Sequence, residues 1–185
     1  GLPPTLRLVL MSGDKVPMDL ALALDAVEGL TVMSLGGPTE TTVWNVLHPV
    51  NGLRPEAVRV PYGGPNRNNR LYVLDAHGRR CPDWVAGELH AAGAGVAKGY
   101  WKDPERTRAS FFWHEALGER LYATGDVCFW RPDGVLEILG RTDFQFKING
   151  LRVELSEIET RLAAHPAVEQ AVACAVPGAN GARLA

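Results

Sequence analysis

The stretch LRLVLMSGDKVPMDLALALDAVEGLTVMSLGGP, residues 6–38, decides the class of fold. Residues 6–11 read as a short buried strand, which a Ser-Gly-Asp turn interrupts. Residues 17–28 have apolar residues at helical spacing, and the proline that opens them suits a first helical turn, where no backbone N–H is needed. Residues 30–34 form a second apolar strand, stopped by Gly-Gly-Pro. A strand–helix–strand unit of this kind predicts parallel strands, and ligands collect where such strands end.

The middle of the chain changes character and predicts an antiparallel, barrel-like or distorted sheet. Short apolar runs alternate there with turn residues, and an Arg-Pro-Asp-Gly turn at residues 131–134 predicts a hairpin. The strands are expected at residues 70–75, 87–91, 120–123, 127–130 and 135–139.

The last part of the chain, from about Asp143, predicts the start of a small α+β unit. Asn149-Gly150 between residues 144–148 and 151–153 is the strongest short hairpin signal in the sequence. Ser156 is expected to cap a helix that runs from about residue 157 to residue 164. A further strand is expected at residues 168–176. The fold class is therefore mixed α/β (α+β).

Composition excludes several functional classes. The formal net charge of −2 gives no basis for nucleic-acid binding, which usually needs a basic face. No apolar run approaches the roughly 20 residues that span a bilayer, so we expect no membrane association and a cytoplasmic location. The three cysteines, Cys81, Cys128 and Cys174, form no CxxC pair, and Cys128 and Cys174 are expected to be buried apolar residues.

Three segments can carry chemistry. Residues 36–42, Gly-Gly-Pro-Thr-Glu-Thr-Thr, offer backbone N–H groups and hydroxyls to anions, and their carboxylate can hold Mg²⁺; a capped turn is the alternative. In residues 122–126, Tyr-Ala-Thr-Gly-Asp, the Asp can accept hydrogen bonds from a sugar diol, although ordinary turn chemistry would also explain it. Residues 140–159 form either a functional hairpin or a solvated edge hairpin before an amphipathic helix.

Taken together with residues 87–100, these segments occur in the order typical of the adenylate-forming superfamily. The resemblance extends from about Leu6 to the end of the chain. The stretch KINGLRVELSEIE, residues 147–159, is most similar to adenylation domains of nonribosomal peptide synthetases. The resemblance implies that residues 1–142 are the C-terminal portion of the large adenylation subdomain. Residues 143–185 would be the hinge and the beginning of the small subdomain.

The resemblance also implies an activity and its site residues. Such enzymes activate an amino acid with ATP to aminoacyl-AMP and pass the acyl group to a phosphopantetheine thiol on a carrier protein. Thr39 and Glu40 would act at the α-phosphate and Mg²⁺, and Lys147 and Gly150 would lie on the hairpin along the pantetheine arm. The expected nucleotide contacts and hinge are Ser12, Gly13, Asp14, Gly36, Gly37, Asp126, Arg141 and Asp143.

The sequence departs from the family pattern before Pro38. The family usually has an aromatic residue that stacks on adenine at the position of Gly36. The Leu35-Gly36 form followed by Trp44 resembles domains that activate cysteine. A small apolar pocket with one aromatic wall is implied, and its walls would be Val9, Met11, Leu35, Val43 and Trp44.

Other parts of the resemblance concern partners and alternatives. We expect a peptidyl carrier protein and, for some such domains, an MbtH-like helper protein. The family's phosphate loop and catalytic lysine are not among the 185 residues, so we expect the chain to be a fragment that does not adenylate alone. The alternatives are a stand-alone acyl- or aryl-CoA ligase and a non-catalytic scaffold domain.

Overall fold

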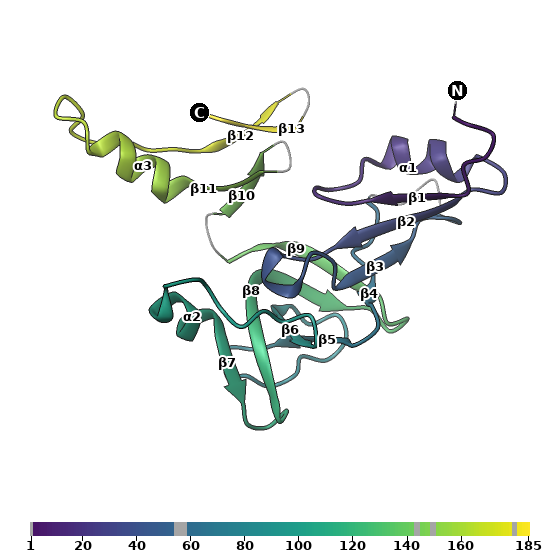
Figure 1. Ribbon diagram of the computed structural model, residues 1–185, viewed down its shortest axis with the longest axis horizontal. Coiled ribbons are helices and arrows are strands. Elements are labelled where there is room, and N and C mark those ends of the chain that lie inside the picture. Colours follow the sequence, from purple (N-terminus) through teal and green to yellow (C-terminus); the bar gives the residue numbers. More distant parts are fainter. Residues whose placement is uncertain (1, 54–58, 143–144, 149–150, 179–180) are drawn as a thin grey trace. The chain divides into compact units, whose positions relative to one another are not determined.

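The computed structural model describes residues 2–53, 59–142, 145–148, 151–178 and 181–185 (Figure 1). The chain divides into two compact units, unit 1 (Gly1–Gly140) and unit 2 (Arg141–Ala185). The identification of these units with the two adenylation subdomains stays a prediction.

Unit 1 begins with the predicted strand–helix–strand unit. Strand β1 (Leu8–Met11) is followed by helix α1 (Met18–Asp25) and strand β2 (Thr31–Gly36), and β1 and β2 are parallel. Two strands that the sequence did not predict, β3 (Val46–Pro49) and β4 (Gly64–Pro65), complete the sheet in the order β1-β2-β3-β4. A core cluster holds α1 on this sheet and consists of Ala21, Leu30, Val32 and Val50.

The second sheet of unit 1 has the predicted antiparallel pairing. Its strands are β5 (Asn69–Leu74), β6 (Gly87–Gly93), β7 (Phe111–His114), β8 (Glu119–Trp130) and β9 (Leu136–Arg141). Their order is β5-β6-β8-β7, and β9 also pairs with β8. The largest core cluster of this region combines Val46 from β3 with Leu71, Val73, Leu89, Ala91, Cys128 and Leu136.

Strand β8 corrects one sequence prediction. The two strands expected at residues 120–123 and 127–130 form one strand of 12 residues. The Thr-Gly-Asp segment between them does not end the strand, because it forms a bulge in β8: Ala123 pairs with His90 of β6 and Val127 pairs with Glu88. Helix α2 (Pro104–Ser110), which the sequence prediction missed, begins where the Asp103 side chain accepts a hydrogen bond from the backbone N–H of Arg106.

Unit 2 contains the predicted hairpin and helix. Strands β10 (Gln145–Ile148) and β11 (Leu151–Glu154) are antiparallel, and helix α3 (Leu155–Ala163) follows directly. Ser156 is therefore the second helical residue and not the cap. Strands β12 (Ala175–Gly178) and β13 (Gly181–Leu184) form a second antiparallel pair.

The strand expected at residues 168–176 is largely wrong. Only its last two residues belong to β12. The Ala173 N–H donates to the Glu159 carboxylate of α3 at 3.0 Å, and the ladder with the chain end starts only at the Cys174–Ala185 pair. Cys174 is exposed, against the prediction, whereas Cys128 is buried as expected. Through the portion of the chain that the structure describes, no helix is long and apolar enough to cross a membrane.

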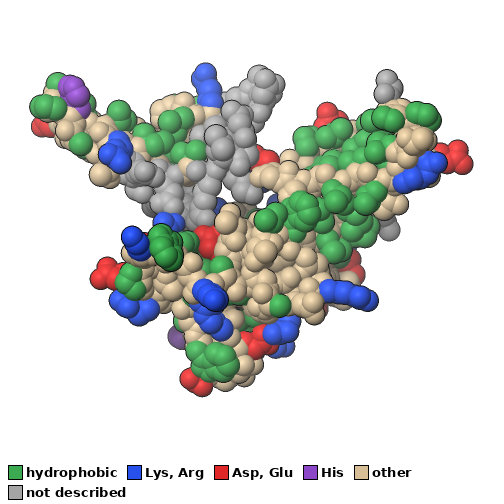
Figure 2. All heavy atoms as spheres, in the orientation of Figure 1, with side chains coloured by type: hydrophobic (Ala, Val, Ile, Leu, Met, Phe, Trp, Pro, Cys, Tyr) green, Lys and Arg blue, Asp and Glu red, His purple; other side chains and the backbone are tan. Residues whose placement is uncertain are grey.

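Exposed apolar side chains gather on one part of unit 1. Figure 2 shows hydrophobic side chains over the region of β1, β2 and α1. Leu8 and Leu10 of β1 and Leu20 of α1 are 50%, 49% and 45% exposed. The alternation along β1 explains this, because its other two side chains face the core under α1.

Candidate nucleotide and magnesium site

Glu40 lies in a single turn of 3-10 helix, Thr39–Thr41, which begins just after β2. The Glu40 residue is only 6% exposed, although its neighbour Thr39 is exposed. Its Oε1 accepts a hydrogen bond from the Tyr100 hydroxyl at 2.6 Å, and its backbone carbonyl accepts one from the Ala97 N–H at 2.8 Å. Segment 97–100 therefore holds both the main chain and the side chain of Glu40.

Gly37 gives this turn its shape. Its φ of +147° favours glycine, and a Cβ there would lie 2.7 Å from Asn45 Oδ1 and 2.8 Å from the Asn45 backbone nitrogen. The Asn45 N–H in turn donates to the Gly36 carbonyl at 3.0 Å. The chain thus folds back on itself around Gly37 and directs Thr39 and Glu40 beyond the end of β2.

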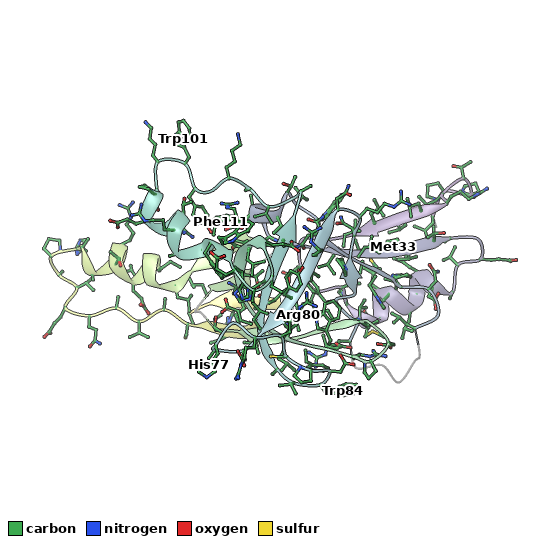
Figure 3. The ribbon with its side chains drawn as sticks, turned by 90° about the horizontal axis from the view of Figure 1, so that it is seen from below. Met33, His77, Arg80, Trp84, Trp101 and Phe111 are labelled. Atoms are coloured by element: carbon green, nitrogen blue, oxygen red, sulfur yellow. The ribbon has the colours of Figure 1, made fainter. Side chains whose placement is uncertain are left out.

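Tyr100 is held by contacts with three neighbouring residues. Its backbone N–H donates to Thr107 Oγ1 at 2.9 Å, the Arg106 guanidinium lies 4.5 Å from its ring centre, and Phe111 meets the ring edge-on at 5.5 Å. Burial and the hydrogen bond to Glu40 raise the pKa of the Tyr100 phenol, so the group stays a donor at neutral pH. Figure 3 labels Phe111 and also Trp101, which is 88% exposed and points away from unit 1.

Asp126 lies at a distortion in the middle of β8. Thr124 Oγ1 donates to the Leu89 carbonyl at 2.8 Å and accepts from the Asp126 N–H at 3.0 Å. Gly125 has a φ of +75°, and its N–H donates to Glu88 Oε1 at 3.2 Å. This arrangement leaves the Asp126 carboxylate half-buried at a kink in an otherwise regular strand, where it can accept hydrogen bonds from a diol.

The Ser12-Gly13-Asp14 turn follows β1 and is exposed. Gly13 has a φ of +96°, and the Asp14 carboxylate accepts a hydrogen bond from the Lys15 N–H at 2.7 Å. Ser12 Oγ accepts a hydrogen bond from the Trp44 indole N–H at 2.9 Å. The structure therefore brings together one expected nucleotide residue and one expected pocket residue.

The other expected pocket residues lie on different surfaces. Val9 and Met11 pack against the core cluster under α1, on the face of the sheet that carries Val32. Leu35 is offset by an odd number of residues from Val32 on β2, and so projects from the opposite face. Val43 is 57% exposed and has a positive φ of 69°.

The remaining expected residues belong to unit 2. Arg141 is the last residue of β9 and is half-buried. Lys147 lies on β10, in a stretch whose side chains are outside the described residues. Asp143 and Gly150 also lie outside the described residues.

The Tyr62 ring occupies the space beside Gly36 that a side chain of residue 36 would fill. Tyr62 was not among the residues predicted from the sequence. A Cβ on Gly36 would fall on the edge of the Tyr62 ring, 2.9 Å from Cζ and 3.0 Å from the hydroxyl oxygen. The Tyr62 ring also packs against the core cluster around Val46 and Leu136. An aromatic ring therefore lies over residue 36, although residue 36 has no side chain.

Two supporting residues were not predicted from the sequence: Glu88, which supports the Asp126 turn, and Tyr100, the partner of Glu40. Both lie in the segment of residues 87–100 that carries the family resemblance, so their position was signalled but their role was not. That role depends on contacts with residues 37 and 60 positions away, which no local pattern indicates.

The carboxylates near the end of β2 determine whether the site fits Mg²⁺. No group of three or more His, Cys, Asp or Glu side chains comes together to hold a metal within the described parts of the chain. Mg²⁺ is often held by one or two carboxylates together with substrate phosphates and water. Glu40 supplies one such carboxylate at the end of β2, so the residues fit an ion that arrives with a nucleotide.

Comparison with known proteins agrees with a nucleotide site of this kind. A family model described as AMP-binding enzyme matches residues 1–101. Because this is more than half of the 185 residues, the chain belongs to the AMP-binding enzyme family.

Individual proteins refine the type of domain. Bacitracin synthase 1 of Bacillus licheniformis is 42% identical over 90% of this chain. The structure of PA1221, an NRPS protein containing adenylation and PCP domains, superposes with a TM-score of 0.86 at 32% identity over 98% of this chain. The Vibrio cholerae adenylation domain AlmE, in complex with glycyl-adenosine-5'-phosphate, gives a TM-score of 0.84 at 33% identity over 96% of it.

The chain is thus an AMP-binding domain of the nonribosomal peptide synthetase adenylation type, and the predicted mixed α/β fold is confirmed. It spans only 3% of bacitracin synthase 1, 37% of the PA1221 chain and 34% of the AlmE chain.

Proposed function

We propose that this chain is part of an adenylation domain that activates an amino acid with ATP to aminoacyl-AMP. The observation that carries the proposal is the buried Glu40 carboxylate, fixed by the Tyr100 hydroxyl at the end of a parallel strand. A carboxylate in this place suits a nucleotide-bound cation, because burial of the charge is costly unless hydrogen bonds or a cation compensate it.

Different residues of the chain would bind different groups of ATP. Glu40 would hold the Mg²⁺ that accompanies ATP, and that ion would neutralise charge on the phosphates. Thr39, exposed beside Glu40, would donate its hydroxyl to an α-phosphate oxygen. Asp126 would accept hydrogen bonds from the ribose hydroxyls, and Arg141 would assist there. Such positioning and charge neutralisation provide most of the catalysis in phosphoryl-group chemistry.

The second half-reaction belongs to the same proposal. Asp143 would be the hinge, and Lys147 and Gly150 would lie along the phosphopantetheine arm of a peptidyl carrier protein. PA1221, which contains adenylation and PCP domains, supports a carrier partner of this kind. A role for an MbtH-like protein and a cytoplasmic location complete the proposal.

For the substrate we propose cysteine or a cysteine-like amino acid. Trp44 is fixed by its hydrogen bond to Ser12, and a fixed indole would form one wall of a compact pocket. Val43 lies next to it and is exposed, as a wall residue must be. Leu35 is the third proposed wall. Val9 and Met11, the other two expected walls, pack against the core cluster under α1, on the opposite face of the sheet from Leu35, and are not part of the proposal.

Amino-acid-dependent ATP–pyrophosphate exchange tests the proposal on the full protein that the gene encodes. We expect exchange with cysteine to exceed exchange with other amino acids, fatty acids and aryl acids. Glu40→Gln should lower the rate by at least about a hundredfold, whereas Glu115→Gln, a change at an exposed carboxylate, should leave it unchanged. Exchange with aryl or fatty acids alone would favour a CoA ligase, and no turnover with any acid would favour a scaffold.

A further inference from the structure

Tyr100 joins the two parts of the candidate site. We propose that Tyr100 is a positioning residue: its hydroxyl orients the Glu40 carboxylate toward the nucleotide-bound cation and couples Glu40 to the strand that carries Asp126. This inference rests on the proposed function, because the role of Glu40 does. Nothing in the sequence pattern assigns such a role to a tyrosine at this position.

Glu40 is a buried carboxylate that needs a partner. A carboxylate that is 6% exposed needs hydrogen bonds to remain ionised without a large desolvation cost. The Tyr100 hydroxyl supplies a short bond to Oε1, at 2.6 Å. Because one oxygen is fixed, the direction of the whole carboxylate is fixed, and a cation ligand that is orientated in advance binds more tightly.

Tyr100 is also linked to β8. The Phe111 ring lies 5.5 Å from the Tyr100 ring and 4.8 Å from the ring of Tyr122 on β8. The Tyr122 side chain also hydrogen-bonds to Tyr100. Tyr122 is the first residue of the Tyr-Ala-Thr-Gly-Asp segment that ends at Asp126. One phenol oxygen therefore connects the buried carboxylate of residue 40 with the strand that is expected to bind ribose.

A second connection runs beside the first and also starts on β8. The Arg120 guanidinium donates to the backbone carbonyls of Ala97 and Lys98 at 2.7 and 2.8 Å. Ala97 then donates its N–H to the Glu40 carbonyl. Arg120 thus fixes the segment that holds Glu40, while Tyr100 fixes the side chain itself.

The ring of Tyr100 is held without its hydroxyl. Arg106 and Phe111 contact the ring, and Thr107 accepts from the backbone N–H. Tyr100→Phe should therefore keep the packing and remove only the hydrogen bonds of the hydroxyl, the one to Glu40 among them. The chain offers a matched control in Tyr72, whose hydroxyl donates to Glu119 Oε1 at 2.7 Å, in a pair that includes neither Glu40 nor Asp126.

The experiment compares Tyr100→Phe and Tyr72→Phe in the full protein that the gene encodes. The first measurement is the Mg²⁺ concentration for half-maximal pyrophosphate exchange at saturating ATP and amino acid. The second is binding of Mn²⁺, followed by electron paramagnetic resonance, in the presence of an ATP analogue that cannot be adenylated. We expect Tyr100→Phe to raise the half-maximal Mg²⁺ concentration and to weaken Mn²⁺ binding, each by about tenfold or more. Tyr72→Phe should change neither quantity.

The outcomes separate the two proposals. If the wild type is active and both variants need the same Mg²⁺ concentration as the wild type, the role of Tyr100 is overturned and the proposed function stays intact. A wild-type protein without exchange with any amino acid would overturn the proposed function, and the role of Tyr100 with it. If Tyr100→Phe does not fold, Tyr122→Phe replaces it: a raised Mg²⁺ requirement supports the coupling, and an unchanged one contradicts it.

Discussion

His90 is a buried histidine whose protonation opposes folding. It is 7% exposed on β6, its Nδ1 lies 3.1 Å from the Glu88 carbonyl, and Phe112 meets its ring edge-on. Burial lowers the pKa of His90 below 6.5; Glu88 acts in the opposite direction, and His114 lowers the pKa further. The folded state therefore prefers the neutral ring.

The sign of the resulting pH dependence follows from linkage. The folded pKa is depressed, so the unfolded chain binds more protons as the pH falls below about 6.5. The contribution of His90 to stability is complete above that pH and is lost as the pH falls through the folded pKa. We expect the free energy of unfolding in urea to be lower at pH 5.5 than at pH 7.5.

Two variants check that His90 is responsible. His90→Gln should reduce the difference between the two pH values, and His77→Gln, at an exposed position, should leave it unchanged. His48, whose pKa is also lowered by burial, contributes in the same direction, so some pH dependence should remain in His90→Gln. Equal pH dependence in the wild type and in His90→Gln would contradict the prediction.

The cysteines give a second prediction at this scale. Burial raises the pKa of the Cys128 thiol, whereas Cys174 is exposed. Because the thiolate is the reactive form, iodoacetamide should modify Cys174 at neutral pH and modify Cys128 only after unfolding. Mass spectrometry of the intact and digested protein measures this, with Cys174→Ser as the control. Early modification of Cys128 in the folded protein would show that β8 opens readily.

At the scale of elements, the end of β2 depends on the pairing of Gly36 with Tyr62. Gly36→Ala should destabilise the protein by about 1–3 kcal/mol, because the new methyl group would overlap the edge of the Tyr62 ring. Tyr62→Leu should relieve the overlap. The double variant should therefore be more stable than the sum of the two single effects predicts.

Urea unfolding of the four proteins in this cycle provides the measurement. Gly13→Ala is the control, because a Cβ at Gly13 meets no atom within 4 Å and its cost is confined to the positive φ. Simple additivity of the Gly36 and Tyr62 changes would contradict the pairing.

Local pattern predicted those elements whose signal is local. The β1–α1–β2 unit, the antiparallel pairing of β10 with β11 and the antiparallel middle are confirmed, because periodicity and turn residues are properties of neighbouring positions. The short strands β3, β4 and β7 were missed. Each is defined by the strand that it pairs with, and β4 has only two residues.

The same distinction between local and distant signals applies to the residues of the candidate site. Glu40 and Asp126 could be singled out from their segments, since carboxylates beside glycine turns have a recognisable chemistry. Their supports, Tyr100 and Glu88, depend on contacts between distant parts of the chain. The single strand β8 was split in the prediction for the same reason: pairing with β6 on both sides of the Thr-Gly-Asp bulge keeps this segment within the strand.

At the scale of the whole chain, the strands of the two units belong to sheets of different size. In unit 1, strands β1–β4 form a four-stranded sheet and β5–β9 form a five-stranded sheet. In unit 2, the described strands form the two-stranded sheets β10-β11 and β12-β13. Since a two-stranded sheet is marginally stable by itself, the two units should open at different rates.

Hydrogen exchange of the backbone amides measures this difference. Amides of β6 and β8, which pair with each other along most of β6 and carry the core residues Leu89, Leu121 and Cys128, should exchange most slowly. Amides of β10, β11, β12 and β13 should exchange at least about tenfold faster, because two-stranded ladders are marginally stable. Strand β1 provides an internal control: it forms the edge of its sheet, so it should be less protected than β2 in the same unit. If unit 2 were protected as well as β6 and β8, the number of strands in a sheet would not determine its protection, and the prediction would be wrong.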